Sequence, residues 1–304
     1  MREKDLNGKE LAKKIRNQLT SEITKFKEET QITPKLGIVY MGEDLSAAAY
    51  IRSKRKRCKK VGMETELFHF SATISLKNLR KELKILNEEE SIHGIILELP
   101  LPPHIPFIEA VASVDPNKDV DGLHPANLGW LFAGNPFFIP NTPWAVMTLL
   151  KEYKIPLRGK EVVIVGRSLS VGKPLIPLML AENATVTTCH TKTKDLKFHT
   201  SNADILVASA GRAKLITGDM IKEGAVVVDV GINVTDDGIV GDVDYEQAYP
   251  RASRITPVPG GVGPITVSMI IRNTLVASVI QAEAKGLNSK VVPIGHAHHS
   301  GYLK

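Results

Sequence analysis

The 304-residue chain has only two cysteines, Cys58 and Cys189, which are far apart and outside any CxxC spacing. This scarcity excludes a disulfide framework and a cysteine-ligated zinc site, and it fits a reducing compartment such as the cytosol. The nine histidines, which include His296, His298 and His299 near the C-terminus, show no helical spacing typical of a zinc pair. We therefore expect no metal site.

The chain also lacks an apolar run of about 18 residues, the length that a membrane span requires. Its N-terminus, MREKDLNGKELAKKI, has no apolar core like that of a signal peptide. We therefore expect a cytoplasmic protein that neither spans nor binds a membrane. Hydrophobic residues make up 43% and charged residues 24% of the chain, which is typical of folded globular proteins rather than disordered ones.

The net charge of +6 is modest, and the basic residues are spread along the chain apart from one cluster, RSKRKRCKK. Such an excess suits nucleic acid or an anionic small ligand equally well. RNA binding ranks last among our hypotheses, because no aromatic side chains interleave with the cluster to stack on bases.

The first half of the chain alternates between helix and strand patterns. Leu11, Ile15, Leu19 and Ile23 lie four residues apart and predict a first helix of roughly five turns. Strands are then expected at 35–41, 65–70 and 93–99, and helices at 46–62 and 75–89. This order is typical of parallel βαβ units. Residues 100–141 are rich in proline and polar turn residues, so regular structure should thin out there.

A second α/β series predicts a doubly wound, Rossmann-like sheet. Its short apolar strands are EVVIVG, ATVTTCH, ADILVASA and AVVVDVG. The apolar segment 265–284 is long enough to leave this domain and pack back on the first. We therefore predict a two-domain α/β fold, with residues 1–141 and 270–304 in one domain and 142–269 in the other.

A glycine turn in the second domain predicts a dinucleotide site. In VVIVGRSLSVGKP a strand ends at Gly166 and a helix begins near Gly172, which presents backbone amides and the helix dipole to a diphosphate. The spacing departs from GxGxxG, and a lone glycine turn also occurs in α/β proteins that bind no cofactor.

The residues around this turn favour NADP over NAD. Arg167 and Ser168 lie in the turn, and Thr191 and Lys192 follow the next strand, where the adenosine ribose lies in such folds. An acidic residue would select NAD there, but none is present, and cationic and hydroxyl donors suit a 2′-phosphate. The alternative is a solvated basic loop.

The first domain carries a candidate acid/base group. Tyr50 and Lys54 are four residues apart, so they share one face of a helix. A lysine beside a phenol can transfer protons if it is desolvated. The alternative is that both side chains lie at the surface with their polar ends in water.

Acidic residues gather at the carboxyl end of the predicted first sheet. The strand HGIILEL ends near Glu98, and the loop DPNKDVDGLHP offers Asp115, Asp119 and Asp121. Clefts in α/β proteins form at this edge. Such loops are also common as turns, and the three aspartates lack the spacing of an EF-hand, so we do not expect them to bind a metal.

Six motifs together carry a family resemblance. They are YIRSKRKRCKKVG, ELPLP, DPNKDVDGLHPANLG, GRSLSVGKP, ATVTTCHTKT and TPVPGGVGP. In this order and at these intervals the chain resembles the FolD family of methylenetetrahydrofolate dehydrogenase/cyclohydrolases over nearly its whole length. The last motif is itself distinctive.

The resemblance implies NADP-dependent oxidation of 5,10-methylenetetrahydrofolate to the methenyl form, followed by hydrolysis to 10-formyltetrahydrofolate. Both steps would share one cleft between the folate-binding catalytic domain and the NADP-binding domain. The family is usually dimeric through the cofactor domain, so we expect a homodimer that serves one-carbon metabolism and purine biosynthesis.

The resemblance also implies roles for individual residues. Tyr50 would stack on the folate, Lys54 would be the catalytic lysine, and Asp121 would hydrogen-bond the pterin ring. Other substrate contacts would be Leu97, Leu99, Pro257, Pro259, Gly260 and Gly261. Cofactor contacts would be Gly166, Arg167, Ser168, Thr191 and Ile232. The glycine turn and the segment after the next strand add Gly172 and Lys192 to the candidate cofactor residues.

The chain departs from the family pattern at three places. Asn141 stands where a cysteine is usual, and Leu169-Ser170 replaces an Asn-Ile pair, but both flanking glycines of that turn remain. Glu98 replaces a glutamine and brings a charge into the proposed active centre. Besides the bifunctional enzyme, this leaves open a dehydrogenase with weak or absent cyclohydrolase activity, and a non-catalytic paralogue.

Overall fold

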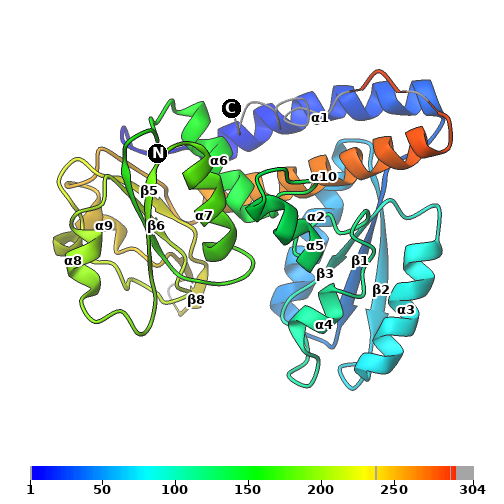
Figure 1. The fold of residues 1–304 in the computed structure, drawn as a ribbon, viewed down its shortest axis with the longest axis horizontal. Coiled ribbons are helices and arrows are strands. Elements are labelled where there is room, and N and C mark those ends of the chain that lie inside the picture. The colour runs from blue at the N-terminus through cyan, green and yellow to red at the C-terminus, as the bar shows by residue number, and fades with distance from the viewer. Residues whose placement is uncertain (1, 237, 288, 292–304) are drawn as a thin grey trace. The chain divides into compact units, whose positions relative to one another are not determined.

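The computed structural model describes residues 2–291 except 237 and 288 (Figure 1). The tail histidines His296, His298 and His299 lie outside the described residues. The chain divides into two compact units. Unit 1 contains the residues up to Lys13 together with Pro140–Thr266, and unit 2 contains Lys14–Ile139 and the described residues from 267 to 291.

Unit 2 is built on the predicted parallel sheet. Its strands are β1 (Lys35–Met41), β2 (Glu64–Phe70) and β3 (Gly94–Leu97), in the order β2-β1-β3. The central strand β1 is buried at six of its seven residues, as expected for a strand with neighbours on both sides. Helices α2 (Leu45–Lys60) and α3 (Leu76–Glu88) begin at the capping side chains of Asp44 and Ser75.

The proline-rich stretch after β3 carries two short helices, α4 (Phe107–Val111) and α5 (Pro125–Phe132). The side chain of His124 accepts a hydrogen bond from the amide of Ala126 and so begins α5. Regular structure therefore does thin out there, and loops occupy most of the remaining residues up to 139.

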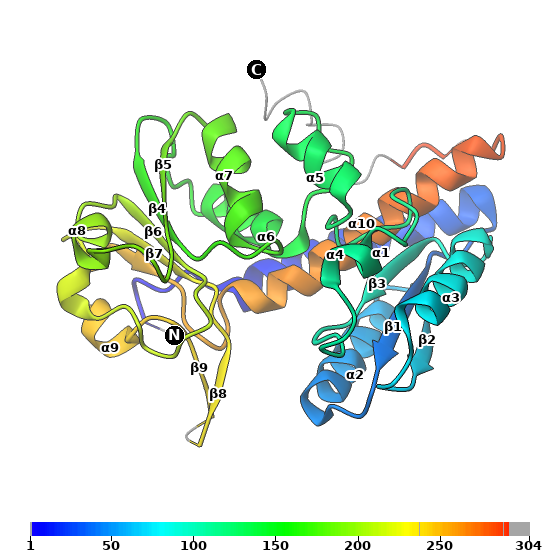
Figure 2. The same cartoon turned by 60° about the horizontal axis from the view of Figure 1, so that its bottom comes forward.

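Two long helices complete the core of unit 2. In both views α1 (Gly8–Thr30) and α10 (Val262–Ala284) run side by side (Figures 1 and 2). Leu19, Ile23 and Phe26 of α1 join one buried cluster with Ile38 of β1 and with Ile271 of α10. The prediction that the C-terminal helix packs on the first domain is confirmed.

By length and composition α10 could cross a membrane, but 83% of its most apolar window is buried inside the protein. It also carries polar groups that bond within unit 2. The side chain of Asn273 donates hydrogen bonds to the carbonyls of Val120 and Ile139, both at 3.1 Å. These bonds anchor the helix to the loop region that follows β3.

Unit 1 contains the predicted second parallel sheet. Its strands are β4 (Glu161–Val165), β5 (Thr185–Cys189), β6 (Ile205–Ala208), β7 (Val226–Asp229) and the two-residue β10 (Arg254–Ile255). Their order is β10-β7-β6-β4-β5, with every pair parallel. The first four strands were predicted, whereas β10 is too short for a periodic pattern.

The remaining elements of unit 1 lie around this sheet. They are the helices α6 (Asn141–Glu152), α7 (Gly172–Ala181), α8 (Leu196–Thr200) and α9 (Tyr245–Ala248), the 3-10 turn η1 (Gly218–Met220), and the strands β8 (Asn233–Thr235) and β9 (Gly238–Val240). Strands β8 and β9 form an antiparallel hairpin that the sequence analysis did not predict. Figure 2 shows this hairpin extending away from the five-stranded sheet.

The N-terminal residues pair with β10, so they belong to unit 1 although the sequence suggested residues 1–141 for the other domain. The amide of Leu6 donates to the carbonyl of Ile255 at 2.8 Å, and the amide of Ile255 donates to that of Lys4 at 3.0 Å. Arg2 adds a two-pronged ion pair with Glu246. The pairing partner lies about 250 residues away, which no local pattern reveals.

Candidate active site and cofactor pocket

Lys54 and Glu98 form a buried ion pair in unit 2, with each residue only 5% exposed. The Lys54 Nζ lies 2.6 Å from the Glu98 Oε2. The same Nζ lies 4.4 Å from the centroid of the Tyr50 ring, within cation–π range. Tyr50 itself remains 39% exposed, so the cluster is open to the outside on the side of the phenol ring.

The backbone explains why these residues meet. Tyr50 and Lys54 are one turn apart on α2, as predicted, and Glu98 directly follows β3. The amide of Glu98 donates to the carbonyl of Val39 at 2.8 Å, which extends the pairing of β3 with the central strand. Glu98 therefore lies at the carboxyl end of the sheet, where α/β proteins form their sites.

The cluster shifts the pKa of Tyr50 and of Lys54. Burial lowers the pKa of Lys54, but the attraction of Glu98, with smaller contributions from Tyr50 and Asp121, outweighs burial, so the net shift is upward. Burial also raises the pKa of Tyr50, and Glu98 and Asp121 raise it further against the opposing charge of Lys54. At neutral pH this lysine is held as an ammonium.

The three loop aspartates have different environments. Asp121 acts electrostatically on Tyr50 and Lys54, so it belongs to this cluster. Asp119 is 3% exposed, and its Oδ2 accepts hydrogen bonds from the amide of His124 at 2.7 Å and the side chain of Asn127 at 2.8 Å. Asp119 thus holds the loop to the start of α5.

Asp115 also stabilises the loop through hydrogen bonds. Its carboxylate accepts a hydrogen bond from the amide of Asn117 at 2.8 Å, and its own amide donates to the side chain of Asn87 at 2.9 Å. Among the residues that the structure describes, no three His, Cys, Asp or Glu side chains gather in a way that could hold a metal ion.

The other expected substrate contacts differ in accessibility. Leu97 is 7% exposed and packs in a buried cluster with Val39 and Leu79, whereas Leu99 is 46% exposed. Leu97 therefore contributes to the core beneath the candidate site, and Leu99 is available to a ligand.

The glycine-rich motif that includes Pro257, Pro259, Gly260 and Gly261 belongs to unit 1. The amide of Gly261 donates to the carbonyl of Pro257 at 2.7 Å and closes a turn. A Cβ added at Gly261 would lie 2.7 Å from the Cβ of Thr256, so the turn leaves no room for a larger residue.

Unit 1 has a pocket of about 420 Å³ at the carboxyl end of its sheet. The order of the strands switches here: β5 pairs with one side of β4, and the next strand, β6, pairs with the other side. Open α/β sheets bind ligands at such a switch point. The lining residues are Val165, Gly166, Arg167, Ser168, His190, Thr191, Thr193, Leu196, Ser209, Ala210, Arg212 and Leu215.

Two glycines allow close backbone contacts at the pocket, one in its lining and one at the start of α7. Gly166 has a φ of +134°, and a Cβ there would lie 2.3 Å from the carbonyl oxygen of Ser209. A Cβ on Gly172 would lie 2.2 Å from the carbonyl oxygen of Gly166, so α7 begins in direct backbone contact with the turn. Only glycine fits either position, which is the arrangement that lets a backbone approach a phosphate.

The turn at the start of α7 is fixed by Ser168. Its Oγ accepts hydrogen bonds from the amides of Val171 at 3.1 Å and Gly172 at 3.4 Å. Of the cofactor residues that the sequence suggested, Gly166, Arg167, Ser168 and Thr191 line the pocket, whereas Gly172 supports it from behind.

Lys192 and Ile232 are exposed residues that do not line this pocket. The amide of Lys192 donates to His190 Nδ1 at 3.1 Å, which leaves the backbone of Lys192 as part of the turn after β5. Besides Val165 at the end of β4, the remaining lining residues were not singled out from the sequence; they are His190, Thr193, Leu196, Ser209, Ala210, Arg212 and Leu215. Their common signal is their position just after β5 or β6.

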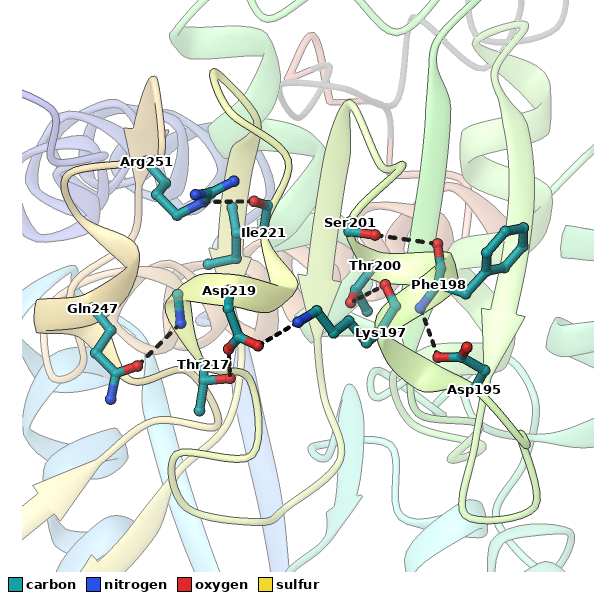
Figure 3. Close-up of polar contacts among 11 residues, drawn as sticks. Asp195, Lys197, Phe198, Thr200, Ser201, Thr217, Asp219, Ile221, Gln247 and Arg251 are labelled. Atoms are coloured by element: carbon teal, nitrogen blue, oxygen red, sulfur yellow. Dashed lines mark hydrogen bonds and ion pairs between the residues drawn. The ribbon is translucent and has the colours of Figure 1, made fainter.

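Helix α8 supplies an apolar wall through Leu196, and a set of polar contacts fixes it (Figure 3). Asp195 caps the helix by accepting the amide of Phe198 at 2.9 Å. Lys197 pairs with Asp219 of η1 at 2.6 Å, and Thr217 donates to the same carboxyl group at 2.6 Å. The Lys197–Asp219 pair joins α8 to η1.

The fold and these sites define a two-unit α/β protein, with a dinucleotide-type pocket in one unit and a buried lysine cluster in the other. Two family models match the chain: the catalytic domain of tetrahydrofolate dehydrogenase/cyclohydrolase over residues 6–121, and the NAD(P)-binding domain of the same family over residues 140–282. The chain belongs to the tetrahydrofolate dehydrogenase/cyclohydrolase family.

Individual proteins and solved structures of the same family are similar to this chain. The chain is 46% identical over 274 residues to the bifunctional protein FolD of Nautilia profundicola, covering 90% of this chain and 96% of that protein. The crystal structure of the bifunctional FolD enzyme from Campylobacter jejuni is 42% identical, with a TM-score of 0.87 over 90% of this chain and 98% of the other. A Trypanosoma brucei FolD structure complexed with NADP and an inhibitor is 38% identical, with a TM-score of 0.85 over 89% and 95% of the chains.

Proposed function

We propose that this chain oxidises 5,10-methylenetetrahydrofolate to 5,10-methenyltetrahydrofolate with NADP and hydrolyses the product to 10-formyltetrahydrofolate. The observation that carries the proposal is a buried lysine, Lys54, in contact with the half-open ring of Tyr50 and with Glu98. An ammonium group is costly to bury, so its burial at the carboxyl end of the sheet beside an exposed phenol ring favours a chemical role.

The cofactor proposal rests on the charge of the unit 1 pocket. The lining has the two guanidinium-bearing residues Arg167 and Arg212, the hydroxyls of Thr191 and Thr193, and no carboxylate. Cationic and hydroxyl donors suit a 2′-phosphate, whereas NAD selection usually relies on an acid at the ribose. Unit 1 would then be the NADP-binding domain and unit 2 the folate-binding domain.

In the dehydrogenase step, bound NADP supplies the chemistry by accepting a hydride from the folate methylene carbon. The protein must hold that carbon in place and keep water away. We assign stacking on the folate to the exposed ring of Tyr50 and acceptance of pterin N–H donors to Asp121. A carboxylate can accept two adjacent donors, which fixes the orientation of a flat heterocycle.

The hydrolase step makes different demands. A water molecule must add to the methenyl carbon, so a nearby base has to take a proton. We assign that role to Lys54, which must pass through its neutral form. Glu98 opposes this by raising the pKa of Lys54, and we therefore propose a bifunctional enzyme whose hydrolase step is slowed relative to its dehydrogenase step.

We also propose that two copies assemble through the β8–β9 hairpin and that the enzyme acts in the cytoplasm in one-carbon supply for purine synthesis. The hairpin exposes Val234 at 78% and Ile239 at 47%, and the neighbouring Ile232 is 61% exposed. Three exposed aliphatic side chains on and beside one small hairpin favour a protein partner over bulk water.

The test is to follow the formation and decay of the methenyl compound with purified protein and with either NADP or NAD. We expect turnover with NADP, a higher kcat/KM for NADP than for NAD, and accumulation of the methenyl intermediate. Replacing Asp121 with alanine should abolish folate-dependent turnover while the protein still folds and binds NADP. A wild-type KM for folate in that variant would overturn the assignment of Asp121.

A further inference from the structure

One wall of the cofactor pocket, the loop after β6, is held from behind by a single buried carboxylate. Ser209, Ala210 and Arg212 of this loop line the pocket. Asp242, whose exposure is 0%, accepts hydrogen bonds from three consecutive amides of the loop. The distances are 2.5 Å to Ala210, 2.9 Å to Gly211 and 2.9 Å to Arg212. The loop therefore has little freedom to move relative to Asp242.

Asp242 is fixed in turn by a second buried carboxylate. Asp229, at the end of β7 and 4% exposed, accepts the amide of Asp242 at 3.0 Å and that of Val243 at 2.9 Å. A Cβ on Gly241 would lie 1.8 Å from the Asp229 Oδ2, so the backbone approaches this carboxylate as only glycine allows. The strand β7 is thus connected to the pocket wall through two side chains.

The same segment backs a second part of the wall. The amide of Ile216 donates to the carbonyl of Asp242 at 2.9 Å, and that of Lys214 donates to the carbonyl of Gly241 at 3.1 Å. Leu215, which lies between these two residues, lines the pocket. Movement of Asp242 would therefore disturb the wall at both Arg212 and Leu215.

Four N–H groups donate to the side chain of residue 242, and this number of donors requires a carboxylate there. Asp242 accepts the three loop amides and also the side-chain amide of Asn233 at 2.9 Å. An ionised carboxylate has about four acceptor sites, whereas the carbonyl of an asparagine has two and its NH2 would face other N–H groups. Burying an anion is costly, and a purely structural filler would not need one.

We propose that Asp242 is a positioning residue of the cofactor site. By fixing the amides of residues 210–212 it sets the pocket wall and presents Arg212 to the adenosine phosphate half of the dinucleotide. The inference rests on the proposed NADP binding and extends it to residues that do not themselves touch the pocket.

The first test measures binding of 2′,5′-ADP, an adenosine phosphate, by calorimetry. Asp242→Asn keeps the shape of the side chain and should weaken binding about 10- to 100-fold, the scale of a lost charge-assisted hydrogen-bond set. In the assay the KM for NADP should rise while the folate KM stays constant. Asp204→Asn is the matched control, since Asp204 precedes β6 at its other end, accepts the amide of Glu161 and pairs with Lys222 at 2.6 Å.

A double-mutant cycle then separates positioning from general damage. If Asp242 acts through Arg212, the combined Asp242→Asn and Arg212→Gln variant should bind 2′,5′-ADP no more weakly than the worse single variant. Full additivity, or wild-type affinity of Asp242→Asn, would overturn the proposal. If Asp242→Asn does not fold, Asn233→Ala, which removes one donor to Asp242, takes its place with the same criteria.

The two proposals fail in different ways. Wild-type protein that binds neither NADP nor 2′,5′-ADP would overturn the proposed cofactor and this inference with it. Tight binding of 2′,5′-ADP by wild-type, Asp242→Asn and Arg212→Gln proteins alike would leave NADP as the cofactor and overturn only the positioning role.

Discussion

At the scale of single residues, the charge on Glu98 has the largest chemical consequence. It lies 2.6 Å from the Lys54 Nζ in a site where both side chains are buried. A neutral amide at this place would hydrogen-bond the lysine without favouring its charged form. The carboxylate instead stabilises the ammonium, and with it the protonation state that cannot act as a base.

We therefore predict that Glu98→Gln raises the hydrolase rate at neutral pH and changes the dehydrogenase rate little. The side chain keeps its size and one acceptor, so Lys54 stays in place while its pKa falls. The measurement is the rate of methenyl decay without cofactor, over a range of pH, beside the rate of NADPH formation. The pH at which hydrolysis reaches half its maximum should move downward in the variant.

The opposite result would assign Glu98 another role. A protonated Glu98 would behave like glutamine, and an ionised one could itself take the proton from water. An unchanged hydrolase rate in Glu98→Gln would indicate the first case and a reduced rate the second. In either case the proposed slowing of the hydrolase step by Glu98 would be wrong.

Residue patterns predicted part of the site. Tyr50 and Lys54 share a helix face, so their spacing alone placed them together, and the glycine turn placed Arg167 and Ser168 at the pocket. The burial of Lys54 could not be predicted in this way. It depends on the ion pair with Glu98, which follows β3 and is distant from Lys54 in the sequence. Arg212 was missed because it follows β6 in a loop with no local signature.

At the scale of elements, the buried strands were predictable and the short ones were not. The strands β1, β4, β6 and β7 are runs of apolar residues bounded by turns, so their existence follows from the sequence. β10 and the β8–β9 hairpin have two or three residues per strand, and tertiary pairing alone defines them. The N-terminal pairing of Leu6 with Ile255 is non-local for the same reason.

The junction of β1 and β3 contains a histidine that links stability to pH. His93 is 5% exposed, its Nδ1 accepts the amide of Lys35 at 3.1 Å, and its carbonyl accepts the side chain of Gln281 at 2.8 Å. Burial, with smaller contributions from the nearby cations Lys118, Lys285 and Lys35, lowers the pKa of His93 to about 4. The folded protein therefore keeps this imidazole neutral.

We predict that the protein loses stability as the pH falls from about 6.5 to about 4, in part through His93. The unfolded chain takes up a proton below pH ~6.5, whereas the folded chain resists it, so acid favours unfolding. The shift corresponds to roughly 3.5 kcal/mol at most, on the scale of about 1.4 kcal/mol per pKa unit. Urea unfolding at several pH values measures it.

The control for this prediction is His93→Asn, whose side-chain oxygen can replace Nδ1 as the acceptor for Lys35. This variant should show a shallower loss of stability between pH 6.5 and 4 than the wild type. Parallel pH profiles in the two proteins would show that another group causes the acid sensitivity.

At the scale of the whole molecule, the β8–β9 hairpin exposes aliphatic side chains that nothing within the single chain covers among the described residues. Val234 and Ile239 lie on the two strands of the hairpin and are 78% and 47% exposed. A two-stranded hairpin is marginally stable by itself and gains from pairing with further strands. A second copy of the chain offers the same surface, so a symmetric interface would cover both hairpins at once.

We predict that replacing both Val234 and Ile239 with glutamate converts the proposed homodimer into a monomer. The introduced charges would face each other across a symmetric interface, where burial and repulsion both oppose association. Light scattering after size-exclusion chromatography should give twice the chain mass for the wild type and the single mass for the variant. Ile85→Glu is the control, because Ile85 is a comparable aliphatic residue, 60% exposed on α3 of unit 2. It should leave the dimer intact, and a wild-type protein that is already monomeric, or a double variant that stays dimeric, would show that the hairpin has another role.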